Sequence, residues 1–381
     1  MKWEKKKLCE CTEYITDGDH QPAPKADKGV HFIKIKDIVN NQVSFDAQVY
    51  VPQEYYDNLP MERKPQKEDV LYTVVGSFGI PSYVQTDELF CFERNIALLH
   101  PNKDIEPRFL YYSLKNPAFY KGVEIVANGS AQKLIPLSKL KDLKISVPDK
   151  EAQRHIADIL SAYDDLIENN QRQIKLLEEA AQRLYKEWFV DLRFPGHENT
   201  KIVDGVPEGW IKEEIGKIIK KVHRTKQIVA SEYKDEGSIP IVDQSRAFVA
   251  GYTNDLEARV DFGIPIIVFG DHTRIVKLIQ FPFAKGADGT QLIISDCLEM
   301  PQRLLYCSIM NVDLSNYHYA RHFKYLKEEK IMIPTVKVAN EFENNVTGIF
   351  SKIQNCRDEI IRCQKTRDLL LPKLMSGEVE V

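Results

Sequence analysis

The sequence predicts an α+β protein in which two similar α/β-type domains are joined by two long antiparallel helices that form a coiled coil. Three observations predict it: a heptad pattern in the middle of the chain, a second heptad pattern at its end, and an internal repeat that relates the two halves. Of the 381 residues, 43% are hydrophobic and 28% are charged, which is typical of a globular protein too long for one ordinary core.

The first long helix is predicted from Pro148 to Val190. Apolar or small residues recur there at spacings of three and four, and Asn170 interrupts them. No glycine or proline lies between Glu151 and Val190, and Asp149 is a suitable N-cap. At about 1.5 Å per residue, the roughly forty residues predict a helix about 60 Å long.

The second long helix is predicted from about Val338 to Leu371, where the first pattern recurs 186 residues later without a gap. The apolar side chains expected to meet form the helix-pair seam: Leu160, Tyr163, Ile167, Ile174, Leu177, Leu184, Trp188, Val346, Ile349, Ile353, Ile360 and Leu370. Antiparallel pairing about Asn170 predicts that Trp188 lies near Val338. Pro372 predicts that the second helix stops earlier than the first at the aligned end.

The globular parts repeat as well. The segment LSKLKDLKISVP at residues 137–148 aligns with FKYLKEEKIMIP at residues 323–334, and both end in a short apolar strand and a proline. Near the start of each half, Trp3 aligns with Trp210. The predicted organisation is a first domain at 1–148, a long helix at 149–191, a second domain at 192–334 and a C-terminal long helix at 335–381.

Charge is unevenly distributed over these parts. The net charge is −4, and the two domains and the C-terminal helix each have equal numbers of basic and acidic residues. The helix at 149–191 has 6 basic and 10 acidic residues. Because like charges repel, this helix is expected to contact protein rather than the phosphates of a nucleic acid.

Both domains contain strand-like apolar runs separated by glycine-rich turns. The runs lie at 30–35, 70–75 and 96–99 before a helix at 108–115, and then at 239–242, 264–269, 275–279 and 292–294. The most distinctive turn is FGDHTR at 269–274. It is either a hairpin turn whose Asp and His satisfy local backbone groups or a loop that presents His272, Thr273 and Arg274 to phosphates or base edges.

Motifs for catalysis and cofactor binding are missing. The chain has no GxxxxGK[ST] phosphate loop, no FxGxG loop and no NPP[FYW] or DPP[FYW] adenine-methylation motif. Cys9, Cys11 and His20 lack a second cysteine pair, and His318 with His322 lacks a third ligand, so no metal site is predicted. Scattered cysteines, no apolar leader and no membrane-length run favour a cytoplasmic location. Such a chain is expected to recognise or scaffold other molecules.

Four blocks of the sequence are distinctive: ISVPDKEAQRHIADILSAYDDLIENN (145–170), LLEEAAQRLYKEWFVDLRFPG (176–196), FGDHTRIVK (269–277) and TRDLLLPKLMSGEVEV (366–381). Two further blocks are VLYTVVGSFGIPSYV (70–84) and GSAQKLIPLSKLKDLKISVP (129–148). On these blocks the whole chain resembles the specificity subunit of type I restriction-modification systems.

The resemblance implies a DNA-specificity subunit that recognises a bipartite site in double-stranded DNA. Each globular part would be a target-recognition domain for one half of the site, and the coiled coil would space the two. Two modification subunits and then restriction subunits would dock on this scaffold. Methylation and cleavage would belong to those partners, so S-adenosylmethionine, ATP and Mg are expected there, and no catalytic residue or cofactor is expected in this chain.

The candidate DNA-binding residues lie in or near turns of both domains: Ser77, Tyr83, Lys133, Gln244, Arg246, His272, Thr273, Arg274 and Lys277. The second half lacks the GSAQ run of residues 129–132, and the counterpart of that run begins near His318. Contacts inferred for one domain therefore do not transfer to the other.

Two other functions remain open on the sequence. A coiled-coil scaffold could bind other proteins through its two globular domains, and a fused restriction-methylation fragment could carry its own chemistry. The missing methylation motifs argue against the fragment. A neighbouring gene that encodes an NPP[FYW] methyltransferase would favour DNA recognition over the scaffold.

Overall fold

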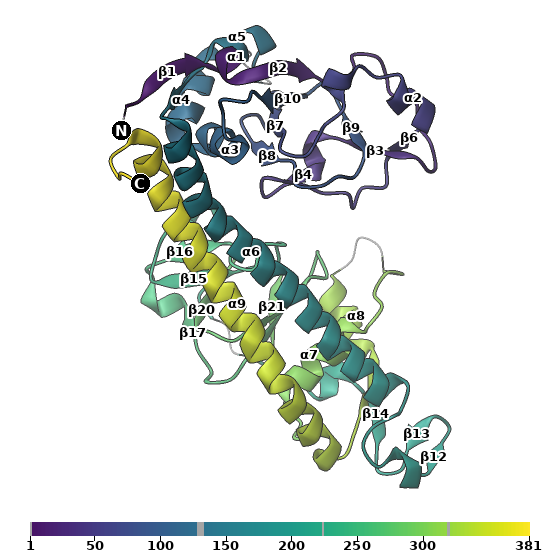
Figure 1. The fold of residues 1–381 in the computed structure, drawn as a ribbon. Helices are drawn as coiled ribbons and strands as arrows, with labels where there is room; N and C mark the ends of the chain where they lie inside the picture. Colours follow the sequence, from purple (N-terminus) through teal and green to yellow (C-terminus); the bar gives the residue numbers. More distant parts are fainter. Residues whose placement is uncertain (1, 128–132, 223–224, 318–320) are drawn as a thin grey trace. The chain divides into compact units, whose positions relative to one another are not determined.

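The computed structural model describes residues 2–127, 133–222, 225–317 and 321–381 (Figure 1). The chain forms two compact units. Unit 1 consists of residues 1–169 and 360–381, and unit 2 consists of residues 170–359. The division crosses both long helices, so each unit holds one globular part and a segment of each helix, whereas the predicted organisation treated the helices as separate parts.

Unit 1 contains two main sheets. The first is antiparallel, with the strand order β2 (Thr12–Asp17), β10 (Ile96–Pro101), β7 (Val70–Thr73) and β8 (Pro81–Tyr83). The second has the order β6 (Tyr50–Val51), β3 (Val30–Ile33) and β9 (Phe90–Phe92), and β3 runs parallel to β9. Two small pairs are β1 (Glu4–Lys7) with β11 (Lys144–Val147) and β4 (Ile38–Val39) with β5 (Gln42–Val43).

The central strand β7 is covered on both faces. Val70 and Tyr72 belong to one buried apolar cluster and Leu71 to another, because successive side chains of a strand point to opposite faces. The helices of this unit outside the long pair are α1 (Leu8–Cys11), α2 (Gln53–Asp57), α3 (Pro107–Lys115), α4 (Pro117–Val126) and α5 (Leu137–Asp142). Asn116 ends α3 and caps α4, since its Oδ1 accepts the N–H of Ala118 at 3.0 Å.

Unit 2 contains the corresponding sheets. One has the order β19 (Val276–Ile279), β18 (Ile266–Gly270) and β21 (Thr290–Ile293), and another has the order β16 (Gly251–Thr253), β15 (Ile239–Val242), β20 (Phe283–Lys285) and β17 (Arg259–Val260). The small pairs are β14 (Ile211–Glu214) with β22 (Lys330–Ile333) and β12 (Ile202–Val203) with β13 (Val206–Pro207). The short helices are α7 (Gln302–Met310) and α8 (His322–Glu328).

Single 3-10 turns occur at η1 (Ile35–Asp37), η2 (Met61–Arg63), η4 (His197–Asn199), η5 (Ile215–Lys217), η6 (Ala230–Glu232) and η7 (Leu256–Ala258).

The internal repeat is visible in the strand pairing. The hairpin β7–β8 corresponds to β18–β19, and in each unit a third strand, β10 or β21, pairs antiparallel with the first strand of the hairpin. The parallel pair β3–β9 corresponds to β15–β20, and the antiparallel pair β1–β11 corresponds to β14–β22. In the described part of unit 2, α4 has no counterpart, which accounts for extra residues in the first copy. The two-domain α+β prediction is therefore confirmed.

The two long helices are α6 (Lys150–Tyr185), followed by the π-helical turn η3 (Lys186–Val190), and α9 (Val336–Ser376). Every predicted seam residue is buried or half-buried. In unit 2 the rings of Trp188 and Phe342 lie 5.7 Å apart, and Asn170 contacts Glu359, so the segments run antiparallel. Trp188 thus packs one helical turn away from the predicted partner Val338.

Polar pairs interrupt the seam within each unit. In unit 2 the buried Asn170 donates to Glu359 at 3.0 Å, and Arg357 donates to Glu178 at 2.7 Å. Burial raises the pKa of Glu178, an effect that Arg357 opposes. In unit 1 Asp164 accepts hydrogen bonds from the Tyr112 hydroxyl at 2.7 Å and from Arg367. These charges have partners, as partly buried charges require.

The predicted early stop of the second helix is wrong. Helix α9 continues through Pro372 to Ser376, because Leu371 and Leu374 on either side are buried in the core of unit 1. A proline inside a helix removes one backbone hydrogen bond, and this packing offsets the loss. The helix ends at Gly377, whose φ is +76° and whose added Cβ would lie 2.6 Å from the indole nitrogen of Trp3.

Candidate functional site

In both units the tip of the hairpin is docked onto the segment that leads into a short helix. In unit 1 the N–H of Ile135 donates to the carbonyl of Val74 at 2.9 Å, just before α5. In unit 2 the N–H of His322 donates to the carbonyl of Asp271 at 2.9 Å, at the start of α8. The duplicated fold therefore joins the same two elements in each copy.

A second backbone bond also recurs. The N–H of Val74 donates to the carbonyl of Asn95 at 2.9 Å, and the N–H of Asp271 donates to the carbonyl of Gly289 at 2.7 Å. Asn95 directly precedes β10, and Gly289 directly precedes β21. These two bonds define which residues of unit 1 and unit 2 are equivalent.

Unit 2 has a groove of about 860 Å³ at this junction. Its lining includes the basic side chains of Lys220, Lys221, Lys285, Arg321 and Lys327, together with His272. The acids that line it are Asp271, which is buried, and Asp288, which is exposed. The groove therefore has an excess of positive charge, as an anionic partner requires.

Unit 1 has a groove of about 470 Å³ at the equivalent junction. It is lined at the hairpin end by Val74 and Val75, and before β10 by Arg94 and Asn95. The rest of its lining comes from Asp17, His20 and residues 134–137. The two copies thus place a groove at the same point of the same scaffold and line it with different chemistry.

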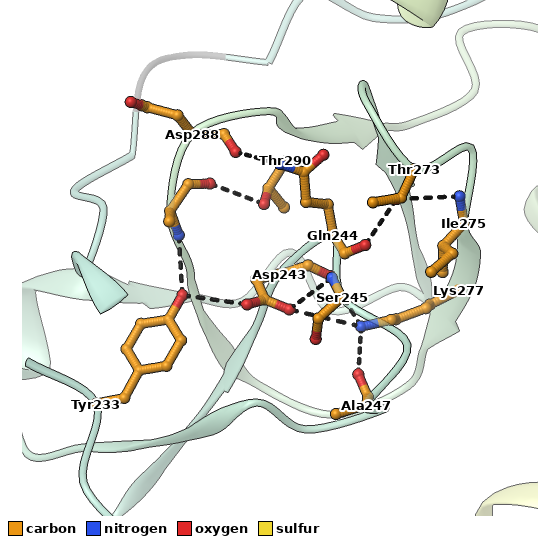
Figure 2. Close-up of polar contacts among 11 residues, drawn as sticks. Tyr233, Asp243, Gln244, Ser245, Ala247, Thr273, Ile275, Lys277, Asp288 and Thr290 are labelled. Carbon is orange, nitrogen blue, oxygen red and sulfur yellow. Dashed lines mark hydrogen bonds and ion pairs between the residues drawn. The ribbon is translucent and has the colours of Figure 1, made fainter. Parts of the chain in front are cut away.

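Gln244 holds two walls of the unit 2 groove together (Figure 2). Its Oε1 accepts the N–H of His272 at 3.1 Å, and its Nε2 donates to the carbonyl of Asp288 at 2.8 Å. Its own carbonyl accepts the hydroxyl of Thr273 at 2.7 Å. A Cβ at Gly289 would lie 2.6 Å from Nε2 of Gln244, so the glycine leaves room for the Gln244 side chain and its hydrogen bonds.

Lys277 lies behind the groove and is only 5% exposed. Its ammonium group donates to the carbonyls of Asp243, at 2.8 Å, and of Ala247, and it lies 3.9 Å from the Asp243 carboxylate (Figure 2). Burial lowers the pKa of Lys277 to about 8. The prediction of a DNA contact at Lys277 is corrected on this ground: the charge fixes the turn at 243–247 and does not face the groove.

The hairpin interpretation of the FGDHTR turn is wrong for Asp271, whose carboxylate accepts the N–H of Phe323, 52 residues further along the chain, at 2.8 Å. Thr273 and Arg274 also donate to distant backbone, to the carbonyls of Gln244 at 2.7 Å and Leu314 at 3.0 Å, and Arg274 has a φ of +60°. His272 is exposed and lines the groove. Arg246 is exposed in the turn after Gln244, outside the lining of the groove. His272 is therefore the predicted residue whose side chain the structure brings to this groove.

The predicted contacts of unit 1 lie outside the lining of its groove. The carbonyl of Ser77 accepts the hydroxyl of Thr73 at 2.7 Å within the hairpin. Tyr83 lies on β8 with the guanidinium of Arg108 5.6 Å above its ring. The ammonium of Lys133 lies 5.4 Å from the ring centre of Phe78, in an exposed position beside the hairpin. Lys133 directly precedes Leu134 of the groove lining, whereas Tyr83 packs against Tyr111 of α3.

Sequence reasoning missed most of the groove. Lys220 and Lys221, Lys285, and Arg321 with Lys327 come from three separate segments, and none was among the predicted contacts. The pair of adjacent lysines and the alignment of the two halves were the available signals, because equivalent positions of a duplicated fold are expected to share a role.

The predicted absence of a metal site concerned two groups of residues. His318 lies outside the described residues, and both ring nitrogens of His322 lie 2.9 Å from the carbonyls of Asp271 and Tyr317. Burial raises the pKa of Cys11 to about 12. Within the described ranges, no group of three or more metal-ligating side chains was found, and no helix is long and apolar enough to cross a membrane.

The chain is similar to proteins of one family. Residues 1–179 match the model described as the type I restriction modification DNA specificity domain. The type I restriction enzyme MjaIX specificity subunit of Methanocaldococcus jannaschii is 29% identical over 316 residues, which cover 76% of this chain and 72% of that protein. The putative MjaX specificity subunit of the same organism is 28% identical over 261 residues, covering 66% of this chain and 61% of that protein.

A solved structure shares the fold over nearly the whole length. It is the S subunit of a type I restriction-modification system from M. genitalium, with a TM-score of 0.60 and 18% sequence identity. The match covers 98% of this chain and 96% of that chain.

Proposed function

We propose that this chain, which is similar to the specificity subunits of type I restriction-modification systems, reads a bipartite DNA sequence, one half with each unit, and carries the partner subunits that act on the DNA. The proposal rests on one observation above all: the two copies place a groove at the same junction and line it with different side chains. Two copies that read the same base sequence would not need different lining side chains. Two copies that read different half-sites need them, because base edges are distinguished by the side chains that contact them.

The unit 2 groove has the charge for the phosphate backbone. Lys220, Lys221 and Lys327 supply positive charge that is independent of base sequence, and such contacts give most of the salt-dependent affinity. His272 and Arg321 lie in the same groove with side chains that can donate to base edges. The groove therefore combines side chains that can bind phosphates with side chains that can contact base edges.

In the proposed function the chemistry belongs to partner subunits. Modification subunits would bind S-adenosylmethionine and transfer the methyl group, and restriction subunits would use ATP and Mg. The helix pair offers a surface for such partners, since acidic and apolar side chains are exposed on α6, among them Glu151, Asp158, Leu166, Leu176 and Glu179. This use fits an acidic helix better than contact with phosphate does.

Methylome sequencing tests the proposal. The chain and its modification subunit are expressed together in a host without other adenine methylation, and each is also expressed alone. Methylation of a two-part motif is expected only when both are present, because the chain supplies recognition and the partner supplies transfer. Methylation with the same motif in the absence of this chain would overturn the proposal, as would the absence of any motif when a complex is shown to form.

A further inference from the structure

We infer that Arg94 and Asp288 read bases at corresponding positions of the two half-sites with opposite hydrogen-bonding roles, Arg94 as a donor and Asp288 as an acceptor. The inference rests on the proposed function and adds the residues that set specificity. It starts from the equivalence of the two grooves, in which both side chains are exposed.

The backbone makes Arg94 and Asp288 equivalent. Arg94 precedes Asn95, whose carbonyl accepts the N–H of Val74 at the end of the hairpin strand β7. Asp288 precedes Gly289, whose carbonyl accepts the N–H of Asp271 at the end of β18. Each residue therefore stands two positions before the strand that pairs with the hairpin, β10 or β21.

The backbone of both turns is held at the reading residue or directly beside it. In unit 1 the Glu93 carboxylate accepts the N–H of Ile35 at 2.8 Å, and its carbonyl accepts the N–H of Ile96 at 3.1 Å. In unit 2 the carbonyl of Asp288 accepts from Gln244, while its carboxylate points away from that network (Figure 2). A fixed backbone with an exposed side chain is what a base-reading residue requires, because reading depends on geometry.

The chemistry separates the two residues. An arginine offers a planar set of donors that matches O6 and N7 of guanine in the major groove. An ionised aspartate only accepts, and it suits the amino group of cytosine or adenine. Asp288 is repelled by phosphate, so its presence among the cations of the unit 2 groove favours a base contact over a backbone contact.

The competing explanation is that Asp288 merely offsets the charge of nearby Lys285, whose ammonium it favours electrostatically. That role would make binding depend on Asp288 equally for every DNA sequence. Base reading would make it depend on one base pair in one half-site. The two explanations therefore differ in what a substitution does to sequence preference.

The test uses complexes of the full chain with its modification subunits, after the two-part motif of the wild type has been determined. Binding is measured on the cognate duplex and on duplexes with each base pair of the motif changed in turn. Asp288→Asn and Arg94→Ala are each expected to lower discrimination at one position by on the order of 10- to 100-fold, in opposite half-sites. Arg94→Lys should keep much of the affinity and still lose discrimination, because lysine lacks the planar fork.

Asp261→Asn is the matched control, since Asp261 is also an exposed aspartate of unit 2 but lies outside the groove. Asp261→Asn should leave the base preference at every position of the motif unchanged. Uniform weakening on all duplexes by Asp288→Asn, or effects of both substitutions in the same half-site, would overturn the inference. If the wild-type complex shows no two-part motif, the proposed function itself fails, which is a separate outcome.

Discussion

The carboxylate of Asp271 caps helix α8 at Phe323, 52 residues further along the chain. Its Oδ1 accepts the N–H of Phe323 at 2.8 Å, and Asp271 is only 6% exposed. The carbonyl of the same residue accepts from the N–H of His322. The backbone and the side chain of Asp271 thus both attach the hairpin of unit 2 to the short helix, and this acid of the groove has a structural partner.

Asp271→Ala should lower the free energy of unfolding by about 1–2 kcal/mol, because it leaves a helix N-terminus without its cap. Asp271→Asn should cost less, since the amide oxygen still accepts. Urea denaturation of the full chain measures both. Asp313→Ala is the control: Asp313 accepts the N–H of Ser315 at 2.8 Å from an exposed position, so its loss should matter little. Equal losses for Asp271→Ala and Asp313→Ala would contradict the capping role.

The heptads predicted which faces of the long helices meet, and they missed the register by one turn. Apolar spacings of three and four accept a shift of one turn with little change in burial. The register is specified instead by partners that the pattern did not pick out, since Asn170 pairs with Glu359 and Trp188 packs against Phe342. Pro372 was misjudged for a similar reason, since tertiary packing of Leu371 and Leu374 outweighs a local helix-breaking preference.

The candidate site was predictable only where it is local. The turn with His272 stands in one short stretch, so its polar residues were visible between two strands. The groove around it is assembled from segments near Lys220, Asp288 and Arg321, which are far apart in the sequence and meet only through strand pairing. Lys277 is a local prediction that failed. Its position after the turn suggested an exposed side chain, whereas on β19 the side chain points inward and is buried.

Gln244→Leu should reduce discrimination at the second half-site, because it releases the backbone of His272 from that of Asp288. Binding to the cognate duplex and to a duplex with that half-site scrambled measures the effect. Gln280→Leu is a matched control, since Gln280 bonds to the carbonyl of Phe350 at 2.8 Å and to Arg303, away from the groove. Both substitutions should lower stability, by about 0.5–1.5 kcal/mol per lost bond. If Gln280→Leu alters discrimination as much as Gln244→Leu does, the hydrogen bonds of Gln244 have no special role in recognition.

Phe342→Ala should lower the free energy of unfolding by about 3–5 kcal/mol, because this ring is fully buried and contacts Trp188 and Phe189. Phe342→Leu should cost less, since it leaves a smaller cavity. Leu176→Ala on α6 should change stability by under about 0.5 kcal/mol, because Leu176 is 58% exposed. Denaturation followed by tryptophan fluorescence gives all three values. Similar losses at Leu176 and Phe342 would show that the helix pair is not held by this contact.

Lys277 should make stability depend on pH in the alkaline range. Its folded pKa of about 8 lies below the ordinary value of 10.5, so between these values the unfolded state binds more protons. The free energy of unfolding of the wild type should therefore rise with pH from 8 to 10 relative to that of Lys277→Met. Below pH 8 both states are protonated and the difference should stay constant. Parallel pH profiles for the two proteins would show that the buried ammonium carries no such cost.

The basic groove of unit 2 should give a measurable share of the salt dependence of DNA binding. Each phosphate contact contributes about −0.9 to the slope of log affinity against log salt concentration. Replacing both Lys220 and Lys221 by alanine should make this slope less steep by up to about 1.8 and should weaken binding to cognate and scrambled duplexes alike. Substitutions of base-reading residues should instead change the sequence preference of binding and have little effect on the salt slope.

The control for this double substitution is replacement of Lys201 and Lys212 by alanine, because both are exposed residues of unit 2 outside the groove. It changes the net charge by the same amount, so any effect of total charge appears in both proteins. The slope is measured by titrating labelled duplex at several salt concentrations. An unchanged slope after loss of Lys220 and Lys221, or an equal change in the control, would mean that the backbone of DNA does not lie in this groove.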